Sequence, residues 1–297
     1  SKYEGFLSTG NLDLGLIFGD TTLFQKIALE GSLSGTGLSR SSADFFLKST
    51  IDKVGVNGYE YSNINTDGEF KEEFFEGKIV IDDPNIKLKV DGKIDVSDER
   101  EEIKALIEMD STNLRNLFLT DQNFIVSTRS NLEINGFGID RITGVGEITS
   151  LLIQNEEKEL SLDNALLGLK RVNEDRIAYI TSDDINAEIS GNFELSSLQA
   201  DLRRLGNEIL IELDNDSTIL NSYYTSLQDQ EATAPYSVQF TIDVENPIEY
   251  LSPFVNDLYI SDQIQLYGGF NKGEQTDLSV NFIADSLSYQ NRAITNS

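Results

Sequence analysis

One stretch of alternating residues, from Asn85 to Ser97, constrains the fold of this chain more than any other. Its even positions hold Ile86, Leu88, Val90, Gly92, Ile94 and Val96, whereas its odd positions hold Lys87, Lys89, Asp91, Lys93 and Asp95. Because successive side chains of a β-strand point to opposite faces, a strand here has one apolar and one charged face. At about 3.3 Å per residue it would be roughly 36 Å long, well beyond the usual five or six residues. We therefore expect one strand of a long amphipathic sheet.

The same alternation recurs along most of the chain, at residues 27–33, 43–51, 75–81, 103–109, 124–134, 185–193, 236–244, 264–270 and 278–284. Turns rich in glycine, asparagine and aspartate separate these segments, which is typical of an antiparallel meander. Between Ile148 and Ile180 the alternation blurs, although strands are still expected there. The fold class predicted from these patterns is all-β and mostly antiparallel.

One segment has the period of a helix instead of a strand. Its leucines and isoleucines are spaced three or four residues apart, at Leu195, Leu198, Leu202, Leu205, Ile209 and Leu213. This spacing predicts an amphipathic helix, within a helical insertion of about residues 196–225, with Ser196 or Ser197 as the N-cap. We expect the helix to cover part of the apolar face or to cap a unit; the alternative is that it plugs or gates a cavity.

A degenerate internal repeat is also visible. Each copy comprises a strand, a short apolar helical connection (a knot), a turn and a strand that contains glycines. The three copies are LDLGLIFGDTTLFQKIALEGSLSGTG, DSTNLRNLFLTDQNFIVSTRSNLEING and VENPIEYLSPFVNDLYISDQIQLYGGF. The copies lie about a hundred residues or more apart, and in such arrays each unit is supported by its neighbours. The sequence therefore predicts one continuous repetitive β-segment over residues 1–297.

Composition excludes several classes of function. The chain has 51 acidic and 23 basic residues, a formal net charge of −28, which argues against nucleic acid or an anionic membrane surface as the main partner. It has neither histidine nor cysteine, so catalytic triads, thiol nucleophiles and ordinary zinc or iron sites are excluded. We predict no enzymatic activity and no cofactor.

Two acidic patterns could still carry chemistry. The pairs Asp82-Asp83, Glu72-Glu73, Glu101-Glu102 and Asp183-Asp184 fall in turns and at polar positions, where a solvated surface is the simpler interpretation than a glycosidase-like acid pair. Asp214, Asp216 and Thr218 have the spacing of half a calcium loop, but the central glycine and the glutamate at the twelfth position are missing.

The apolar face of the sheet remains as the candidate site. Alternating strands usually face a second sheet, so an ordinary core is one alternative. An outer-membrane barrel with its apolar face toward lipid is another, although the chain has no tryptophan and no visible aromatic girdles.

Several segments resemble a known family. FFEGKIVIDDPNIKLKVDGKIDVS, INGFGIDRITGVGEI and the first and third repeat segments are similar to the large AsmA-like periplasmic proteins of the TamB type, from the translocation and assembly module, in the form seen in Bacteroidota-like sequences. The resemblance spans nearly the whole chain and rests on a pattern of strands, glycines and polar turns. It implies an elongated U-shaped, taco-like β-groove, apolar inside and polar outside, of which this chain would be an internal portion.

The resemblance also implies a function and a location. The family is linked to phospholipid transfer along a hydrophobic groove between the inner and outer membranes of the envelope. Relatives are anchored in the inner membrane by an N-terminal helix and contact an outer-membrane barrel of the BamA type, which here would involve parts outside this segment. We therefore expect a periplasmic segment that binds phospholipid acyl chains, the alternatives being a factor that templates strands of outer-membrane proteins and a purely structural envelope protein.

The expected lipid-binding groove is a strip of apolar side chains. It consists of Ile79, Ile81, Ile86, Leu88, Val90, Ile94, Val96, Ile107, Phe124, Val126, Ile189, Tyr236, Val238, Phe240, Ile242, Leu266, Phe270, Val280 and Phe282.

Overall fold

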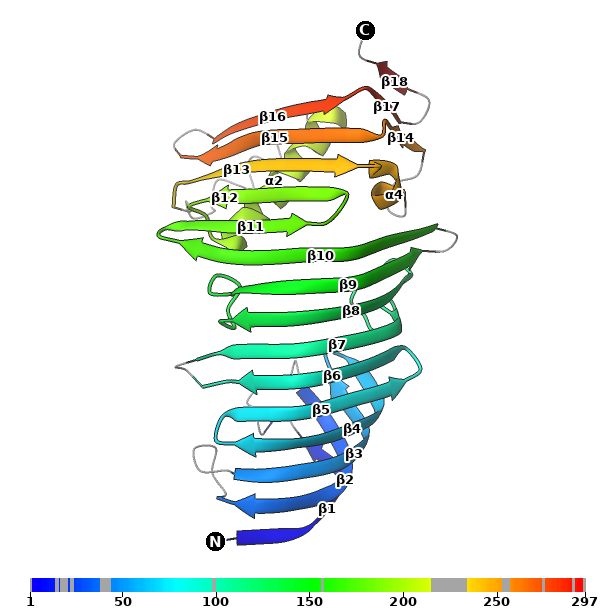
Figure 1. The fold of residues 1–297 in the computed structure, drawn as a ribbon, viewed down its shortest axis with the longest axis vertical. Coiled ribbons are helices and arrows are strands. Elements are labelled where there is room, and N and C mark those ends of the chain that lie inside the picture. The colour runs from blue at the N-terminus through cyan, green and yellow to red at the C-terminus, as the bar shows by residue number, and fades with distance from the viewer. Residues whose placement is uncertain are drawn as a thin grey trace.

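The protein is dominated by one very large antiparallel sheet (Figure 1). The computed structural model describes residues 2–13, 16, 21, 24–37, 44–97, 100–155, 158–214, 234–252, 257–273, 276–289 and 292–295. Fifteen strands pair in the order in which they occur in the chain, and the sheet grows from the N-terminal end to the C-terminal end without a crossover. A second sheet of three strands, β14, β17 and β18, lies at the C-terminal end.

The strands are long, as the alternation predicts. The large sheet consists of β1 (Lys2–Asp13), β2 (Phe24–Thr36), β3 (Asp44–Val56), β4 (Tyr59–Lys71), β5 (Phe74–Asp83), β6 (Ile86–Asp95), β7 (Glu102–Asn113), β8 (Phe124–Asn135), β9 (Thr143–Asn155), β10 (Lys158–Val172), β11 (Asp175–Thr181), β12 (Ile185–Gly191), β13 (Tyr236–Glu245), β15 (Gln263–Lys272) and β16 (Thr276–Ala284). The small sheet consists of β14 (Leu258–Ile260), β17 (Ser286–Tyr289) and β18 (Arg292–Thr295). The helices are α2 (Leu195–Asp214) and α4 (Pro247–Leu251).

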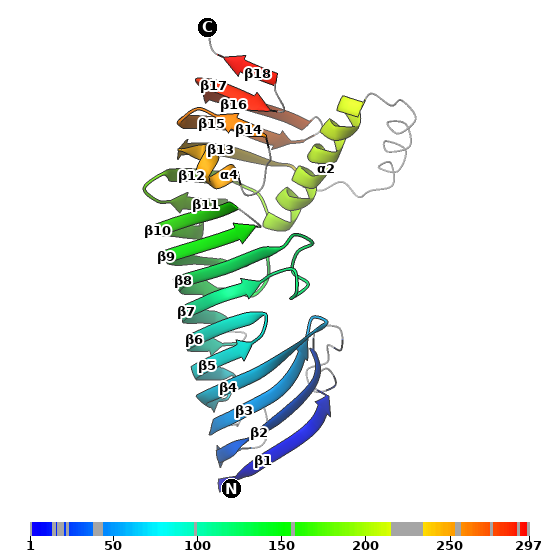
Figure 2. The same cartoon turned by 90° about the vertical axis from the view of Figure 1, so that its right-hand side faces the viewer.

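The sheet is bowed into an elongated open trough (Figures 1 and 2). Its apolar face is the concave one, and α2 lies on that side (Figure 2). The predicted fold class, an antiparallel β-groove with one amphipathic helix and short helical turns, is confirmed. The trough has two rims, which we name after the helices that lie on them. At the α2 rim β1 begins and β12 ends; at the α4 rim β1 ends and β13 ends.

The repeat seen in the sequence corresponds to three connections at the α4 rim. They follow the first, seventh and thirteenth strands of the sheet, so they are spaced at intervals of six strands. Two of them begin alike: the carboxylate of Asp13 accepts a hydrogen bond from the amide of Leu16, and the side-chain oxygen of Asn113 accepts one from the amide of Asn116. The third begins with Asn246 before α4. Ile17, Phe18, Gly19, Asp20 and Phe254, which the sequence pattern includes in these knots or their turns, lie outside the described residues.

One β-bulge, together with an unpaired residue on the next strand, explains why the alternation blurs between Ile148 and Ile180. Ser130 pairs with Ile148 and Arg129 with Ser150, which leaves Thr149 out of the ladder. On the next strand Asn164 is also skipped and has a positive φ of 52°. Each extra residue shifts the apolar positions from one parity to the other in mid-strand, so the face stays apolar while the sequence loses its period.

The predicted helix is present, but its predicted N-cap is wrong. α2 begins at Leu195, so Ser196 and Ser197 lie in its first turn rather than before it. The expected end of the helical insertion near residue 225 lies outside the described residues. Among the described helices, none is both long and apolar enough to span a membrane.

Candidate functional site

Strand pairing brings the predicted apolar residues together on the concave face. Ile79 pairs with Val90, and Val90 also pairs with Ile107 on its other side. Near the C-terminal end, Ile242 pairs with Leu266, and Leu266 with Phe282. All of the predicted residues lie in strands on this face except Val96, which directly follows β6 and is 42% exposed.

The concave face is more open in its N-terminal part than in its C-terminal part, although Ile27, Val54 and Ile64 form a buried cluster there, against which Ile79 and Ile81 pack. In β5 to β7, side chains such as Ile79, Val90 and Ile107 are half-buried, and none of the described strands forms a second layer over them. Near α2, in contrast, Tyr236, Val238 and Phe270 are only 4–6% exposed and pack with Phe193 and Leu198. Beside the uncovered residues, hydrocarbon of another molecule could replace water.

A row of small residues crosses β4 to β7, three positions from the α2-rim end of each strand. Gly68, Gly77, Gly92 and Ala105 are neighbours in register on four adjacent strands. A Cβ added to Gly92 would lie 2.2 Å from the carbonyl oxygen of Lys104, and one added to Gly77 would lie 2.4 Å from that of Asp67. Larger side chains are therefore excluded from this row, which lets the strands bend toward the concave side.

The convex face carries ladders of cross-strand ion pairs. Nζ of Lys78 lies 2.9 Å from the carboxylate of Asp91, and Nζ of Lys104 lies 2.6 Å from that of Glu133. All four side chains are well exposed, so each pair contributes little to stability. These charged side chains keep the convex face hydrated, so the concave face is the apolar surface of the sheet.

At the α4 rim, one buried carboxylate at the end of β5 connects β4 with the β5–β6 turn. Asp83 is 1% exposed and accepts hydrogen bonds from the hydroxyl of Tyr59 at 2.6 Å, the amide and hydroxyl of Ser62 at 2.9 and 2.7 Å, and the amide of Asn85 at 2.9 Å. Burial alone would raise the pKa of Asp83, but these hydrogen bonds outweigh it and hold the pKa below its ordinary value. Asp83 is therefore a structural anion that fixes the β5–β6 turn.

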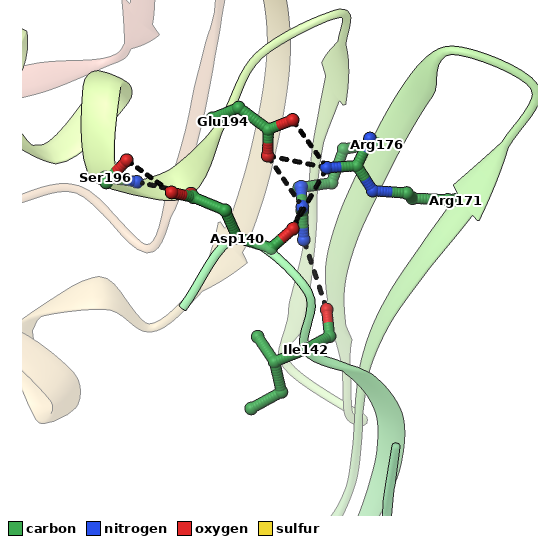
Figure 3. A network of polar contacts seen from close by, with 6 residues as sticks. All are labelled: Asp140, Ile142, Arg171, Arg176, Glu194 and Ser196. Carbon is green, nitrogen blue, oxygen red and sulfur yellow. Dashed lines mark hydrogen bonds and ion pairs between the residues drawn. The ribbon is translucent and has the colours of Figure 1, made fainter. Parts of the chain in front are cut away.

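At the α2 rim, a polar network anchors the beginning of α2 (Figure 3). The guanidinium of Arg176, which is fully buried, donates to the backbone carbonyls of Asp140 and Ile142 and to the carboxylate of Glu194. Arg171 donates to the same carboxylate.

The same network supplies the cap of α2. The carboxylate of Asp140 accepts hydrogen bonds from the amide of Ser196 at 2.9 Å and from its hydroxyl at 2.6 Å (Figure 3). These bonds hold the pKa of Asp140 below its ordinary value. The cap thus comes from the β8–β9 connection rather than from the helix itself, which is why the local sequence did not reveal it.

A second contact holds α2 against the floor of the trough, two turns further along. The carboxylate of Asp201 accepts hydrogen bonds from Nζ of Lys272 at 2.5 and 2.7 Å and from the hydroxyl of Tyr236 at 2.7 Å. Burial and the neighbouring carboxylate raise the pKa of Tyr236, so its hydroxyl remains a proton donor. The sequence pattern included Tyr236 in the strip but did not single out Asp201 or Lys272; the available signal was a lysine at an apolar position of β15.

α4 covers the concave face from the opposite rim. Tyr250 packs against the cluster of Leu160, Leu162 and Ala165, and its hydroxyl donates to the carboxylate of Asp184 at 2.7 Å. Burial and Asp184 raise the pKa of Tyr250 above its ordinary value. The C-terminal part of the trough is therefore covered from both rims.

The other candidate residues of the sequence lie apart from one another. Asp82 pairs with Lys87, Glu101 with Arg141 and Glu102 with Lys104, in different turns or strands. Asp214 ends α2, and Asp216 and Thr218 lie outside the described residues. Within the described part of the chain, no three side chains of the metal-binding types gather as a possible metal site.

Comparisons of the chain with protein-family models, with curated proteins and with solved structures find no match. The function therefore has to be argued from the trough itself.

Proposed function

We propose that this chain is a segment of a bridge-like lipid conduit, in which phospholipid acyl chains lie on the concave face while the headgroups stay in water. The observation that supports this proposal is a continuous apolar face on a sheet of fifteen strands, with none of the described strands forming a second layer over its N-terminal part. With neighbouring strands about 4.8 Å apart, the face is about 67 Å long.

The energetics of lipid transfer favour a surface of this kind. Each methylene moved from an apolar surface into water costs about 0.8 kcal/mol, so wetting a sixteen-carbon chain costs on the order of 12 kcal/mol. A continuous apolar floor removes most of that barrier. A weak and uniform surface also transports better than a tight pocket, because a lipid held firmly at one point would not move on.

The open side of the trough is also consistent with this function. A phospholipid has a bulky hydrated headgroup that cannot enter a closed apolar tunnel. None of the described strands lies over β5 to β7, and Val90 and Ile107 are only half-buried, so a headgroup could remain outside while its chains lie on these residues.

Two adjacent residues of β7 offer a matched test. Ile107 lies on the concave face, and Leu106, 58% exposed, lies on the convex face. Ile107→Glu should reduce transfer of a fluorescent phospholipid between vesicles by at least about tenfold, because a charge on the floor interrupts the apolar path. Leu106→Glu adds the same charge to the other face and should transfer at the native rate.

The same comparison can be repeated at other positions and with another readout. Val90→Glu and Phe240→Glu should act like Ile107→Glu, with circular dichroism as the folding control. Mass spectrometry of the gently purified native protein should detect bound phospholipid. Equal transfer by the Ile107 and Leu106 variants would contradict the proposal, as would a native protein that carries no lipid.

The proposed location and partners follow from the resemblance to AsmA-like proteins of the TamB type. In that arrangement the trough lies in the periplasm, its inner-membrane anchor lies outside this segment, and a BamA-type barrel is contacted through other parts of the protein. The strongly acidic chain argues against nucleic acid as the ligand.

A second candidate function, templating of outer-membrane protein strands, is supported by the free edge of the sheet. Among the described strands, β1 pairs only with β2, and its exposed side chains include Phe6, 70% exposed, and Leu7, 41% exposed. Such an edge can accept a further strand by β-augmentation. A photocrosslinker at Phe6 that captures peptide, with none of the native protein carrying lipid, would favour this function over the conduit.

A further inference from the structure

The charged residues of the concave face are distributed unevenly. By their register, β1 to β9 carry a single charged side chain on this face, the buried Asp83. In β10 to β16 the charged residues on this face are Lys158, Arg171, Arg176 and Lys272. All four are cations, in a chain whose net charge is −28, and three of them lie at the α2 rim. Arg171 and Arg176 bind the carboxylate of Glu194, so Lys272 is the cation of this rim that could take an anionic ligand beside the apolar floor.

The carboxylate of Asp201 occupies such a position. Nζ of Lys272 and the hydroxyl of Tyr236 converge on its two oxygens at 2.5–2.7 Å. The Lys272 and Asp201 side chains are only 17% and 11% exposed, so the contact is largely shielded from water. Two donors arranged around a pair of oxygens would fit two oxygens of a phosphate equally well.

The apolar neighbours of Asp201 correspond to the acyl part of a lipid, as its carboxylate corresponds to the phosphate. Leu198, one turn before Asp201 on α2, is 8% exposed and packs with Val238 and Phe270 on the floor of the trough. α2 therefore presents an anion to the rim and a hydrocarbon side chain to the floor at the same place. A phospholipid has the same two parts in the same order.

Resting on the proposed function, we infer that Lys272 and Tyr236 bind the phosphate of a phospholipid whose acyl chains lie on Val238 and Phe270, and that α2 occupies this site in the structure through Asp201 and Leu198.

α2 is attached in a way that allows this exchange. Its beginning is tied by Asp140 and Glu194, which are independent of the Asp201 contact. Beyond the first two turns the helix is less enclosed: Leu202 is 50% exposed. A lipid that enters from the trough can therefore displace the Asp201 carboxylate from Lys272 and Tyr236 while the N-terminal end of α2 stays in place.

The test compares two lipids that differ only in the phosphate. Fluorescent phosphatidic acid and diacylglycerol with the same acyl chains are titrated, in non-ionic detergent micelles, against the native chain and its variants. Asp201→Asn removes the competing anion and should tighten binding of phosphatidic acid by roughly three- to tenfold, without changing binding of diacylglycerol. Lys272→Gln and Tyr236→Phe should each weaken binding of phosphatidic acid only.

A matched control separates local from general electrostatics. Asp243 lies on the same strand as Tyr236 but on the convex face, so Asp243→Asn makes the same change in net charge away from the site. It should leave both affinities unchanged. Circular dichroism of each variant checks the fold, and Tyr236→Phe, which removes one hydroxyl, keeps the test valid if a charge variant is unstable.

The other outcomes are distinguishable. If both lipids bind the native chain but Asp201→Asn and Asp243→Asn affect them equally, the phosphate site is disproved and the conduit stands. If neither lipid binds any variant, the proposed function fails and the site with it. If millimolar inorganic phosphate displaces all of the phosphatidic acid, the site binds free phosphate and the assignment to lipid is overturned.

Discussion

At the scale of single residues, Asp83 shows how a buried charge can hold a long sheet in register. Its carboxylate is surrounded by donors from β4 and from the turn between β5 and β6. Tyr59, one of these donors, also accepts a hydrogen bond from the side chain of Asn85, which in turn accepts one from Asn116. The network thus links the β5–β6 turn to the connection that follows β7.

We predict that Asp83→Asn lowers the free energy of unfolding by roughly 1–3 kcal/mol at neutral pH, because the amide cannot satisfy all of these donors. The lowered pKa also sets the pH dependence. The stability due to Asp83 is fully present above its ordinary pKa of 3.8 and is lost as the pH falls through the lower pKa of the folded state. Denaturant unfolding measured between pH 7 and pH 2 should therefore show that the free energy of unfolding decreases less with falling pH in the variant than in the native protein.

The adjacent Asp82 provides the control for this prediction. Its side chain is 68% exposed and pairs with Lys87, so Asp82→Asn should change stability by no more than about 0.5 kcal/mol. An equal loss in both variants would contradict the role assigned to Asp83.

At the scale of strands, the row of small residues determines where the sheet can bend. We predict that Gly92→Ala destabilises the protein by roughly 1–3 kcal/mol, because the new Cβ would collide with the backbone of β7. Gly5, which continues the register of this row on β1, would have no atom within 4 Å of an added Cβ, so Gly5→Ala should be neutral or slightly stabilising. Urea denaturation of both variants measures the difference, and equal effects would show that the row does not matter.

Prediction from sequence succeeded for these elements where the determining signal is local. Alternation in β6 and β13 assigns their residues to a face because side-chain direction depends only on the strand itself. It failed for the cap of α2, because Asp140 is 56 positions away from Ser196 in the chain. It also did not identify the contact of Asp201 with Lys272, since their proximity depends on the path of α2 over β13 and β15.

At the scale of the molecule, each strand of the large sheet pairs, among the described strands, only with its neighbours in the chain, apart from the insertion around α4 and β14. Arrays of this kind have stability that is the sum of local and nearest-neighbour contributions. The face that we propose to carry lipid can therefore loosen in one part without unfolding elsewhere.

Hydrogen exchange measured by mass spectrometry on two variants tests this locality. Gly92→Ala should speed amide exchange in β5, β6 and β7 and leave β13 and β15 unchanged, because the strain acts on neighbouring strands. Leu198→Ala should do the reverse, since Leu198 packs on Val238 of β13 and Phe270 of β15. If either variant accelerates exchange evenly from β1 to β16, the trough is a single cooperative unit, and a lipid could not loosen one section of it independently of the others.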